Sequence, residues 1–365
     1  MTGMDADVVV VGGGAMGSAA AWQLAARGAD TVLLERFEPG HVRGASHGAS
    51  RIFRYAYPDP YYAELAVQAL RHWRDIEATT RRELLTVTGG VDHGPAPDVA
   101  LIAEALDAAG VPGEWLPAEQ AAERWPGLRF DTPVLHHAST GRLDADQAVD
   151  AFQQLAAGAG AQVHHDARVT EIRRGIDAVE VVVGDEVMRA GRVVVAAGAW
   201  TRRLLDGLVD LPELQVTQEQ PAHFAALTEG EWPSFIHYRG PDLAPFHMGY
   251  GLRTPGEGVK IGFHHSGPEC DPDARDFAPE PTRQQALLDY VREWVPGVDA
   301  DSSTPISCTY TTTPTADFVV DVSDRIVVAA GFSGHGFKFA PLVATMVADL
   351  VAGGEPVHPR FALAR

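Results

Sequence analysis

Cysteine is scarce in this chain, because only Cys270 and Cys308 occur among its 365 residues. Two cysteines cannot supply the disulfide framework of a small secreted protein, and such low usage is typical of a reducing compartment. A cysteine with a special role must therefore matter for its chemistry.

Basic residues are outnumbered as well. Lys and Arg number 29 against 49 Asp and Glu, which gives a formal net charge of −20. A surface of this sign repels phosphate backbones and anionic membranes. We therefore expect neither a nucleic acid nor a membrane as a partner.

Long apolar runs are missing too. No stretch approaches the roughly 20 apolar residues that span a bilayer. The segment MTGMDADVVVVGGG has an acidic residue where a signal peptide needs basic ones, and its apolar run is too short for a secretory core. These absences predict a cytoplasmic protein.

What the chain has is length and apolar content. With 365 residues, 45% of them hydrophobic, it exceeds the size at which a single core stops growing. Two domains that share one interface are the natural expectation.

The N-terminal part has the pattern of a βαβ unit. Residues 7–11 form a continuous apolar run typical of a buried strand, 15–27 have apolar residues at helical spacing, and 31–34 form a second buried strand. Between the first strand and the helix stands Gly12-Gly13-Gly14-Ala15-Met16-Gly17, which fits the dinucleotide fingerprint G-x-G-x-x-G.

Each glycine of this fingerprint has a mechanical reason. Gly12 permits the tight turn, Gly14 lets a pyrophosphate approach the backbone, and Gly17 lets the helix pack close to the strand. The amides that open the helix, at Ala15 and Met16, supply hydrogen-bond donors and partial positive charge to the phosphates.

Glu35 completes the pattern. It stands 18 residues after Gly17, at the end of the second strand, where a carboxylate can accept hydrogen bonds from a ribose. The alternative is a glycine turn in some other α/β protein, but context, spacing and the acidic residue together favour a dinucleotide site.

The rest of the chain alternates between helical and strand patterns. A long stretch after Glu35, dense in Gly, Ser, His and Arg, has the length of a functional loop. We predict helices at residues 61–80, 99–109, 118–124, 144–157 and 341–352, and strands at 161–165, 168–173, 179–188, 192–200, 216–224, 258–264 and 325–332.

Two of these strands, at 192–200 and 325–332, run into glycine turns as the first strand does, and the segment at 193–200 favours FAD over NAD. The region from about 211 to 300 has short alternating runs instead, typical of antiparallel strands that face a ligand. We predict an α/β fold with a discontinuous Rossmann-like FAD-binding domain and a substrate domain that has a mainly antiparallel sheet and helices. The expected FAD-binding domain covers 1–83, 140–210 and 300–365, and the expected substrate domain covers 84–139 and 211–299.

Four segments, in order along the chain, resemble one family. They are Ser46-His47-Gly48 with Arg51-Ile-Phe-Arg54, residues 258–264, Cys308-Thr-Tyr310, and residues 331–339. In them the chain resembles the monomeric sarcosine oxidase and N-methyltryptophan oxidase group of FAD-dependent amine oxidases, which have the D-amino acid oxidase-like fold. The similarity runs from Val8 to about Ala352 and implies FAD as the cofactor.

The resemblance gives Cys308 a role. The family carries FAD covalently, through a thioether from a cysteine to the 8α-methyl of the flavin, and Cys308 is the matching residue. Without the resemblance, a lone cysteine in a β-rich stretch is usually a small buried hydrophobe. Cys270 matches no position of the family, and we expect it to be inert.

Arg54 and Lys338 match the two cations with which the family holds the substrate carboxylate. An amino acid anion that enters a partly dry cavity needs such charges to replace its hydration. The alternative for each is a solvated surface charge, which is the commoner state of Arg and Lys.

Lys260 aligns with the lysine that the family uses to activate oxygen. Electron transfer to O2 creates superoxide, so a fixed cation near the flavin favours that step. The alternative is an exposed charge on a strand face. His264, His47, Tyr250 and Tyr310 match positions that line the flavin or the substrate cavity, and Tyr250 needs a one-residue gap in the alignment.

The glycine-rich loop at 331–336 could place amide donors near the pyrimidine end of the flavin, where they would favour reduction. The full set of residues expected to bind FAD is Gly12, Gly14, Ala15, Met16, Gly17, Glu35, Arg36, Ser46, His47, Arg51, Val169, Gly198, Trp200, Cys308, Gly334, Gly336 and Lys338.

Three pairs of adjacent histidines, at 136/137, 164/165 and 264/265, invite a metal hypothesis. Neighbouring residues on a strand point to opposite faces, so such a pair cannot chelate one ion. We expect no metal.

The resemblance implies an oxidase of secondary or N-methylated α-amino acids. It would oxidise the carbon–nitrogen bond to an imine and reduce O2 to H2O2, while Arg54, Lys338, His264 and Lys260 supply placement and electric field. Two alternatives stay open. One is a flavin dehydrogenase or D-amino acid oxidase relative that passes electrons elsewhere, and the other is a nucleotide-binding protein with a silent site.

The substrate itself stays open. The segment from about 211 to 248, including Met248, matches the family poorly, and Arg253 stands where relatives often have proline. Arg253 could select an acidic side chain or face solvent. Sarcosine, a bulkier N-methyl amino acid, a cyclic imino acid and a glycated amino acid are all compatible with the sequence. The resemblance and the strong negative charge predict a monomer.

Overall fold

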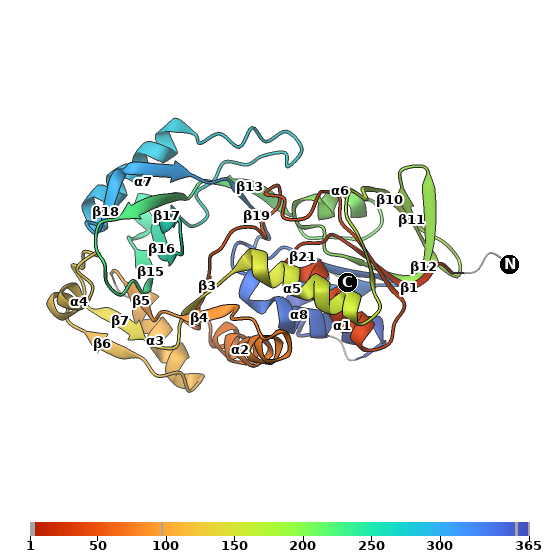
Figure 1. Cartoon of the computed structure of the whole chain (residues 1–365), viewed down its shortest axis with the longest axis horizontal. Helices are drawn as coiled ribbons and strands as arrows, with labels where there is room; N and C mark the ends of the chain where they lie inside the picture. The colour runs from red at the N-terminus through yellow and green to blue at the C-terminus, as the bar shows by residue number, and fades with distance from the viewer. Residues whose placement is uncertain (1–3, 96–97, 355–356, 364–365) are drawn as a thin grey trace.

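The computed structural model describes residues 4–95, 98–354 and 357–363. Two large sheets lie towards opposite ends of the long axis of the molecule (Figure 1). One contains the N-terminal strand and the other contains most of the strands between Gly90 and Pro305.

The first sheet has a parallel centre, in the order β21-β12-β1-β2-β9. Residues Val8 to Val11 of β1 are all buried, because Val8 and Val10 belong to one apolar cluster and Val9 and Val11 belong to another, so both faces of this strand are covered. The strands of this sheet are β1 (Ala6–Val11), β2 (Thr31–Leu34), β9 (Gln162–His164), β10 (Val169–Arg174), β11 (Val179–Val183), β12 (Glu186–Val195), β20 (Val319–Ser323) and β21 (Ile326–Ala330).

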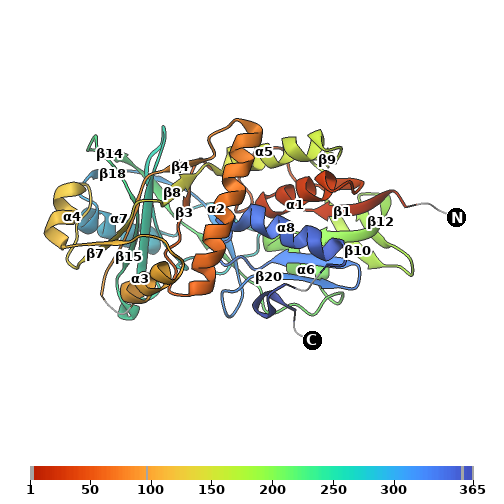
Figure 2. The ribbon, with the colours of Figure 1, turned by 90° about the horizontal axis from the view of Figure 1, so that it is seen from below.

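Helices cover one face of this sheet (Figure 2). Helix α1 (Ala15–Ala26) packs between α5 (Ala145–Gly158) and α8 (Ala340–Val351), and α2 (Pro60–Thr80) packs against α8. Helix α1 is rich in alanine, which allows this close approach on both sides. Helix α1 therefore has a helix on each side and the sheet beneath it, which fixes the turn between β1 and α1.

The second sheet is antiparallel except between β15 and β5. Its order is β18 (Val298–Pro305), β14 (Ala222–Ala226), β17 (Gly258–Phe263), β16 (Met248–Thr254), β15 (Ser234–Tyr238), β5 (Gly90–His93), β7 (Val134–His137) and β6 (Glu114–Leu116). The helices of this half are α3 (Asp98–Ala108), α4 (Ala118–Arg124) and α7 (Pro281–Trp294).

Short elements join the two halves. Strands β13 (Gln215–Glu219) and β19 (Cys308–Thr312) pair with each other, and β3 (Arg51–Phe53), β8 (Gly141–Leu143) and β4 (Leu85–Val87) form a three-stranded sheet. The remaining helical elements are α6 (Thr201–Leu205) and four 3-10 turns at Gly198–Trp200, Pro241–Leu243, Phe337–Phe339 and Pro359–Phe361.

The predicted fold class is confirmed, and most predicted helices lie within one or two residues of their observed bounds. The domain boundaries remain a prediction. Helix α7 was missed, because only three of its residues are buried and it lies within a region of alternating strands. The predicted strand at 179–188 is wrong as one element, because the chain turns at Gly184 between β11 and β12, and the predicted break between 188 and 192 is wrong, since β12 runs through it.

The predicted strand at 216–224 is wrong as one element. It divides into β13 and β14, which belong to different sheets, and Pro221 lies between them. Proline cannot donate to a ladder, so the chain changes sheets there. Among the described residues, no helix has both the length and the apolar content that crossing a bilayer requires.

Candidate active site

A cavity of about 670 Å³ runs between the two halves of the molecule. This volume lies within the usual range of ligand sites. The cavity begins at the β1–α1 turn and ends among strands β16, β17 and β19. Of the predicted residues, those that line it are Gly12, Gly14, Ala15, Met16, Glu35, Arg36, Ser46, Arg51, Arg54, Val169, Gly198, Trp200, Tyr250, Lys260, His264, Cys308, Tyr310, Gly334, Gly336 and Lys338.

Two predicted residues do not line the cavity. Gly17 lies behind it, where a Cβ atom would collide with the carbonyl oxygen of Gly12, so its geometry fits the predicted packing of α1 on β1. His47 is buried, and its Nε2 has no hydrogen-bond partner among the described residues. Burial, together with the charges of Arg51 and Lys260, lowers the pKa of His47 to about 3.

The glycine turn packs closely against the neighbouring strand and lines the cavity. Gly12 has a φ of +106°, and a Cβ there would lie 2.5 Å from the carbonyl oxygen of Ala196. The amide of Ala15, at the start of α1, donates to Ser46 Oγ at 3.0 Å. The first turn of α1 therefore faces the cavity, as a pyrophosphate site requires.

Glu35 is held beside this turn. Its Oε2 accepts from the Gly13 amide at 2.6 Å, and its Oε1 accepts from the Phe37 amide at 2.9 Å. Burial raises the pKa of Glu35, but the hydrogen bonds from His41 and these two amides outweigh it, and the pKa is lowered. The carboxylate is ionised and can accept hydrogen bonds from hydroxyl groups of a ribose.

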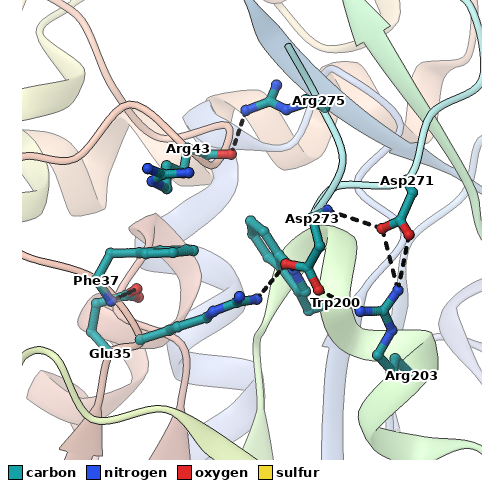
Figure 3. A network of polar contacts seen from close by, with 9 residues as sticks. Glu35, Phe37, Arg43, Trp200, Arg203, Asp271, Asp273 and Arg275 are labelled. Atoms are coloured by element: carbon teal, nitrogen blue, oxygen red, sulfur yellow. Dashed lines mark hydrogen bonds and ion pairs between the residues drawn. The ribbon is translucent and has the colours of Figure 1, made fainter. Parts of the chain in front are cut away.

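A network of polar contacts includes Trp200, Arg203 and Asp273 (Figure 3), which line the cavity. Asp273 accepts from Arg36 at 2.6 Å and from Trp200 Nε1 at 2.9 Å, and it also contacts Arg203. The sequence did not indicate Asp273, because it lies 237 residues from Arg36. This network joins the segment after β2 to the loop that precedes α7.

Cys308 and Lys260 lie further into the cavity. Cys308 faces Glu219 across the β13–β19 ladder. Lys260 Nζ donates to the Ser50 carbonyl at 3.1 Å, and the side chain is 9% exposed. Burial, and then the charge of Arg51, lowers the pKa of Lys260 to about 7.

At the inner end of the cavity, Lys338 is buried and the Arg54 side chain is 15% exposed. Arg54 Nη1 lies 3.4 Å from Asp92 Oδ1 and donates to Tyr238 Oη at 3.3 Å. Burial lowers the pKa of Arg54, but Tyr238 and Asp92 outweigh it and keep the guanidinium charged. For Lys338, burial and then the charge of Arg54 hold the pKa well below its ordinary value.

Neither lysine of the chain is an ordinary surface charge. The chain contains two lysines in all, Lys260 and Lys338, and both are buried side chains that line the cavity. Arginine supplies every other basic side chain apart from histidine. The lysine count is the one signal in the sequence that marks these two positions without any relative.

The wall opposite the cations is aromatic and neutral. His264 Nδ1 lies 3.2 Å from Tyr310 Oη. Burial, then the charges of His265 and His335, hold the pKa of His264 well below its ordinary value, while burial raises the pKa of Tyr310 and of Tyr250. The His264 imidazole is therefore neutral and has one nitrogen that can accept a hydrogen bond.

Several residues of the site were missed by sequence reasoning. Asp92 carries the charge that balances Arg54, and its Oδ2 lies 2.6 Å from His137 Nε2, whose Nδ1 lies 2.5 Å from Thr140 Oγ1. Arg253 does not line the cavity, although Met248, Tyr250 and Leu252 of the same strand do. The alternation of β16 therefore directs Arg253 to the other face.

The argument about the histidine pairs needs correction. His264 and His265 follow β17 and His165 follows β9, so the argument from opposite strand faces applies in full only to the pair 136/137 on β7. Among the described residues one group, His93, Asp131 and His237, has the spacing of metal ligands. The rings of His93 and His237 stack at 4.1 Å with an angle of 18°, so their lone pairs do not converge, and we assign no ion.

The residues of the cavity fit FAD. The glycine turn lines the cavity, Glu35 is an ionised acceptor where a ribose is expected, and the same cavity extends to the cations Arg54 and Lys338. A nicotinamide or flavin dinucleotide needs the first two features. The residues Cys308, Lys260 and Arg51 then surround the position expected for the ring system.

Comparison with known proteins agrees with this geometry. Residues 7–350 match the family model of FAD dependent oxidoreductases. The chain is 34% identical to a monomeric sarcosine oxidase of Streptomyces avermitilis, over 97% of this chain and 95% of the relative. It is 32% identical to a monomeric sarcosine oxidase of Bacillus sp. strain B-0618, over 96% of this chain and 93% of the relative.

A solved structure has the same fold. It is NikD, described as an unusual amino acid oxidase essential for nikkomycin biosynthesis, with a TM-score of 0.89 and 28% identity over 99% of this chain and 98% of that chain. The resemblance drawn from the sequence is thereby confirmed. Since the family match spans nearly the whole chain and the cavity has the shape and the donors that FAD needs, this protein is a flavoenzyme that belongs to the family of FAD-dependent oxidoreductases.

Proposed function

We propose that this flavoenzyme is an oxidase of secondary or N-methylated α-amino acids, which converts the carbon–nitrogen bond to an imine and reduces O2 to H2O2. The observation that carries the proposal is the pair of cations that line the cavity, the buried Lys338 and the partly buried Arg54, together with the apolar side chains of Ile236, Met248 and Phe332. FAD, when bound, supplies the two-electron acceptor that takes the hydride equivalent from the substrate and passes the electrons on to O2.

Arg54 and Lys338 bind the substrate carboxylate. Among the residues that the structure describes, none bonds Nη2 or Nε of Arg54, so these donors remain for an anion. The planar guanidinium can present two parallel donors to a carboxylate, which fixes its orientation as well as its position.

His264 and Tyr310 orient the amine. Because the imidazole is neutral, one of its nitrogens can accept a hydrogen bond from a substrate N–H, and Tyr310 fixes the ring from the other side. The apolar side chains of Ile236, Met248 and Phe332 line the same compartment and exclude water from it.

In its protonated form, Lys260 places a positive charge near the position expected for the flavin ring. Its charge would favour the transfer of electrons to O2, which develops negative charge. Electron transfer to O2 is what separates an oxidase from a flavin dehydrogenase or a D-amino acid oxidase relative that uses another acceptor.

The direct test is a screen for peroxide. The purified, FAD-loaded protein is incubated in air with sarcosine, bulkier N-methyl amino acids, cyclic imino acids such as pipecolate, and glycated amino acids, and H2O2 is measured. Release of peroxide with any of them supports the proposal. Bleaching of the flavin without peroxide would favour a dehydrogenase, and no bleaching with any substrate would favour a silent nucleotide-binding protein.

We also propose that Cys308 forms a thioether to the flavin 8α-methyl. Cys308 lines the same cavity as Arg51 and Lys260, where the flavin ring is expected. Acid precipitation of the wild type should leave yellow colour in the pellet, and Cys308→Ala should release the flavin to the supernatant. Cys270→Ala is the matched control and should leave the pellet yellow, whereas flavin found wholly in the wild-type supernatant would refute the linkage.

Further parts of the proposal rest on the sequence. The division into an FAD-binding domain at 1–83, 140–210 and 300–365 and a substrate domain at 84–139 and 211–299 is supported by the separate sheets. A monomer in the cytoplasm is supported by the net charge of −20 and the scarcity of cysteine. The partners are then a small amino acid or amine and O2.

A further inference from the structure

Tyr57 stands between the two cations of the inner compartment, although it does not line the cavity. It follows β3 and is 7% exposed. Lys338 Nζ donates to Tyr57 Oη at 2.7 Å, across 281 residues of sequence, and Arg54 Cζ lies 5.1 Å from the centre of the Tyr57 ring. Lys338 Nζ lies 5.1 Å from the same centre, so it sits at the hydroxyl end of the ring and not over its face.

The hydrogen bonds around Tyr57 have a fixed direction. Its hydroxyl lies 3.3 Å from His335 Nδ1, and His335 Nε2 lies 3.0 Å from the Ala316 carbonyl oxygen, which can only accept. His335 therefore carries its proton on Nε2 and accepts on Nδ1. The Tyr57 hydroxyl must then donate to His335 and accept from Lys338.

The donors of Lys338 can be counted. An ammonium group has three N–H donors. One donates to Tyr57 Oη, a second donates to the His335 carbonyl at 2.9 Å, and the third has no partner among the described residues. The Lys338 carbonyl also accepts from Trp73 Nε1 at 2.7 Å, so the backbone from which the side chain extends is fixed as well.

We propose that Tyr57 is a positioning residue of the carboxylate clamp: its hydroxyl and the His335 carbonyl occupy two donors of Lys338 and leave one, beside the free edge of Arg54, for a single carboxylate group. This rests on the proposed function, because it assumes that the ligand of Lys338 is the substrate carboxylate. The clamp then takes up a proton at Lys338 when the anion binds.

The charges around Lys338 support this coupling. The groups that face it are Arg54 and Tyr57 from the segment before α2, His335 from the glycine-rich loop, and His264 after β17. None of them carries a negative charge, and burial and Arg54 lower the pKa of Lys338. A bound carboxylate supplies the missing negative charge and raises that pKa, so the anion and the proton bind together.

The chain offers an unusual way to observe this, because it has two lysines. Enzyme labelled with 13C at the lysine Cε position gives two lysine signals. In Lys260→Met only one lysine remains, so its signal is that of Lys338. The FAD-loaded enzyme is titrated with benzoate, a carboxylate without an oxidisable carbon–nitrogen bond, while the lysine signals and the visible flavin absorption are followed at several pH values.

In the wild type, benzoate should shift the Lys338 signal to the ammonium position. Tyr57→Phe keeps the ring beside Arg54 and removes the acceptor, so the Kd of benzoate should rise about 10- to 100-fold, the range for one hydrogen bond to a charged group. The pH above which binding is lost should also move downwards. Tyr62→Phe is the matched control, because Tyr62 stacks on Tyr57 but its hydroxyl donates to Asp317 at 2.9 Å, and it should bind as the wild type does.

The failures are distinguishable. Suppose that the wild type binds benzoate, that Lys338→Met does not bind it, and that Tyr57→Phe binds it with unchanged Kd and pH dependence. The inference about Tyr57 is then overturned and the proposed function stands. If no carboxylate moves the Lys338 signal or the flavin spectrum of the wild type, the carboxylate clamp and the inference fall together.

Discussion

Replacing Lys260 by methionine is expected to slow the reaction of the reduced enzyme with O2 by about 10²- to 10³-fold, the usual effect of removing one fixed charge or donor from a reaction centre. Lys260 is buried and its Nζ is held by the Ser50 carbonyl, so no other lysine or solvent cation can replace it. Stopped-flow mixing of anaerobically reduced enzyme with oxygenated buffer measures this step alone.

The same variant should leave anaerobic reduction by substrate nearly intact, because Lys260 is proposed to act only on the oxygen step. Lys260→Arg is the matched control, since it keeps the positive charge and should retain much of the rate. Equal reoxidation rates in the wild type and in Lys260→Met would defeat the proposed role.

The pH dependence of this step follows from the pKa of Lys260, which is lowered to about 7. The protonated form is the useful one, so the advantage is present below the pKa and is lost as the pH rises through it. A negative charge on a bound flavin would move the midpoint upwards. The wild type should therefore show a downward step in reoxidation rate with rising pH, and Lys260→Met should show none.

Replacing Arg54 by alanine is expected to lower kcat/KM for amino acid substrates by about 10²- to 10³-fold, because a truncated partner of a buried charge pair costs about 3–4 kcal/mol. The loss should be much smaller for an amine that has no carboxylate. Steady-state peroxide release with matched substrate pairs measures this difference.

Two further variants show why kcat/KM falls in Arg54→Ala. Arg54→Lys keeps the charge but cannot present two parallel donors, so we expect it to recover only part of the activity. Arg54→Ala also leaves Asp92, which is fully buried, without its cation, and the double variant with Asp92→Asn removes that strain. If a carboxylate-free amine suffers as much as its amino acid counterpart, Arg54 does not bind the carboxylate.

The sequence by itself determined the nucleotide half of the site. The apolar run before Gly12, the spacing to Gly17 and the acidic residue at Glu35 are local features, and local periodicity predicts local structure. The identities of Cys308, Lys260, Arg54 and Lys338 came from motifs, and all four side chains line the same cavity.

The tertiary structure alone decided what surrounds those residues. The acceptor of Lys338 comes from Tyr57, 281 residues away, and the countercharge of Arg54 comes from Asp92 on β5, which is held by His137 on β7. Asp92 and His137 lie on strands whose own pattern serves the sheet, and Tyr57 lies in the connection between β3 and α2. No periodicity in a chain specifies which distant polar group will satisfy a buried charge, because that choice depends on how two sheets and their connections pack.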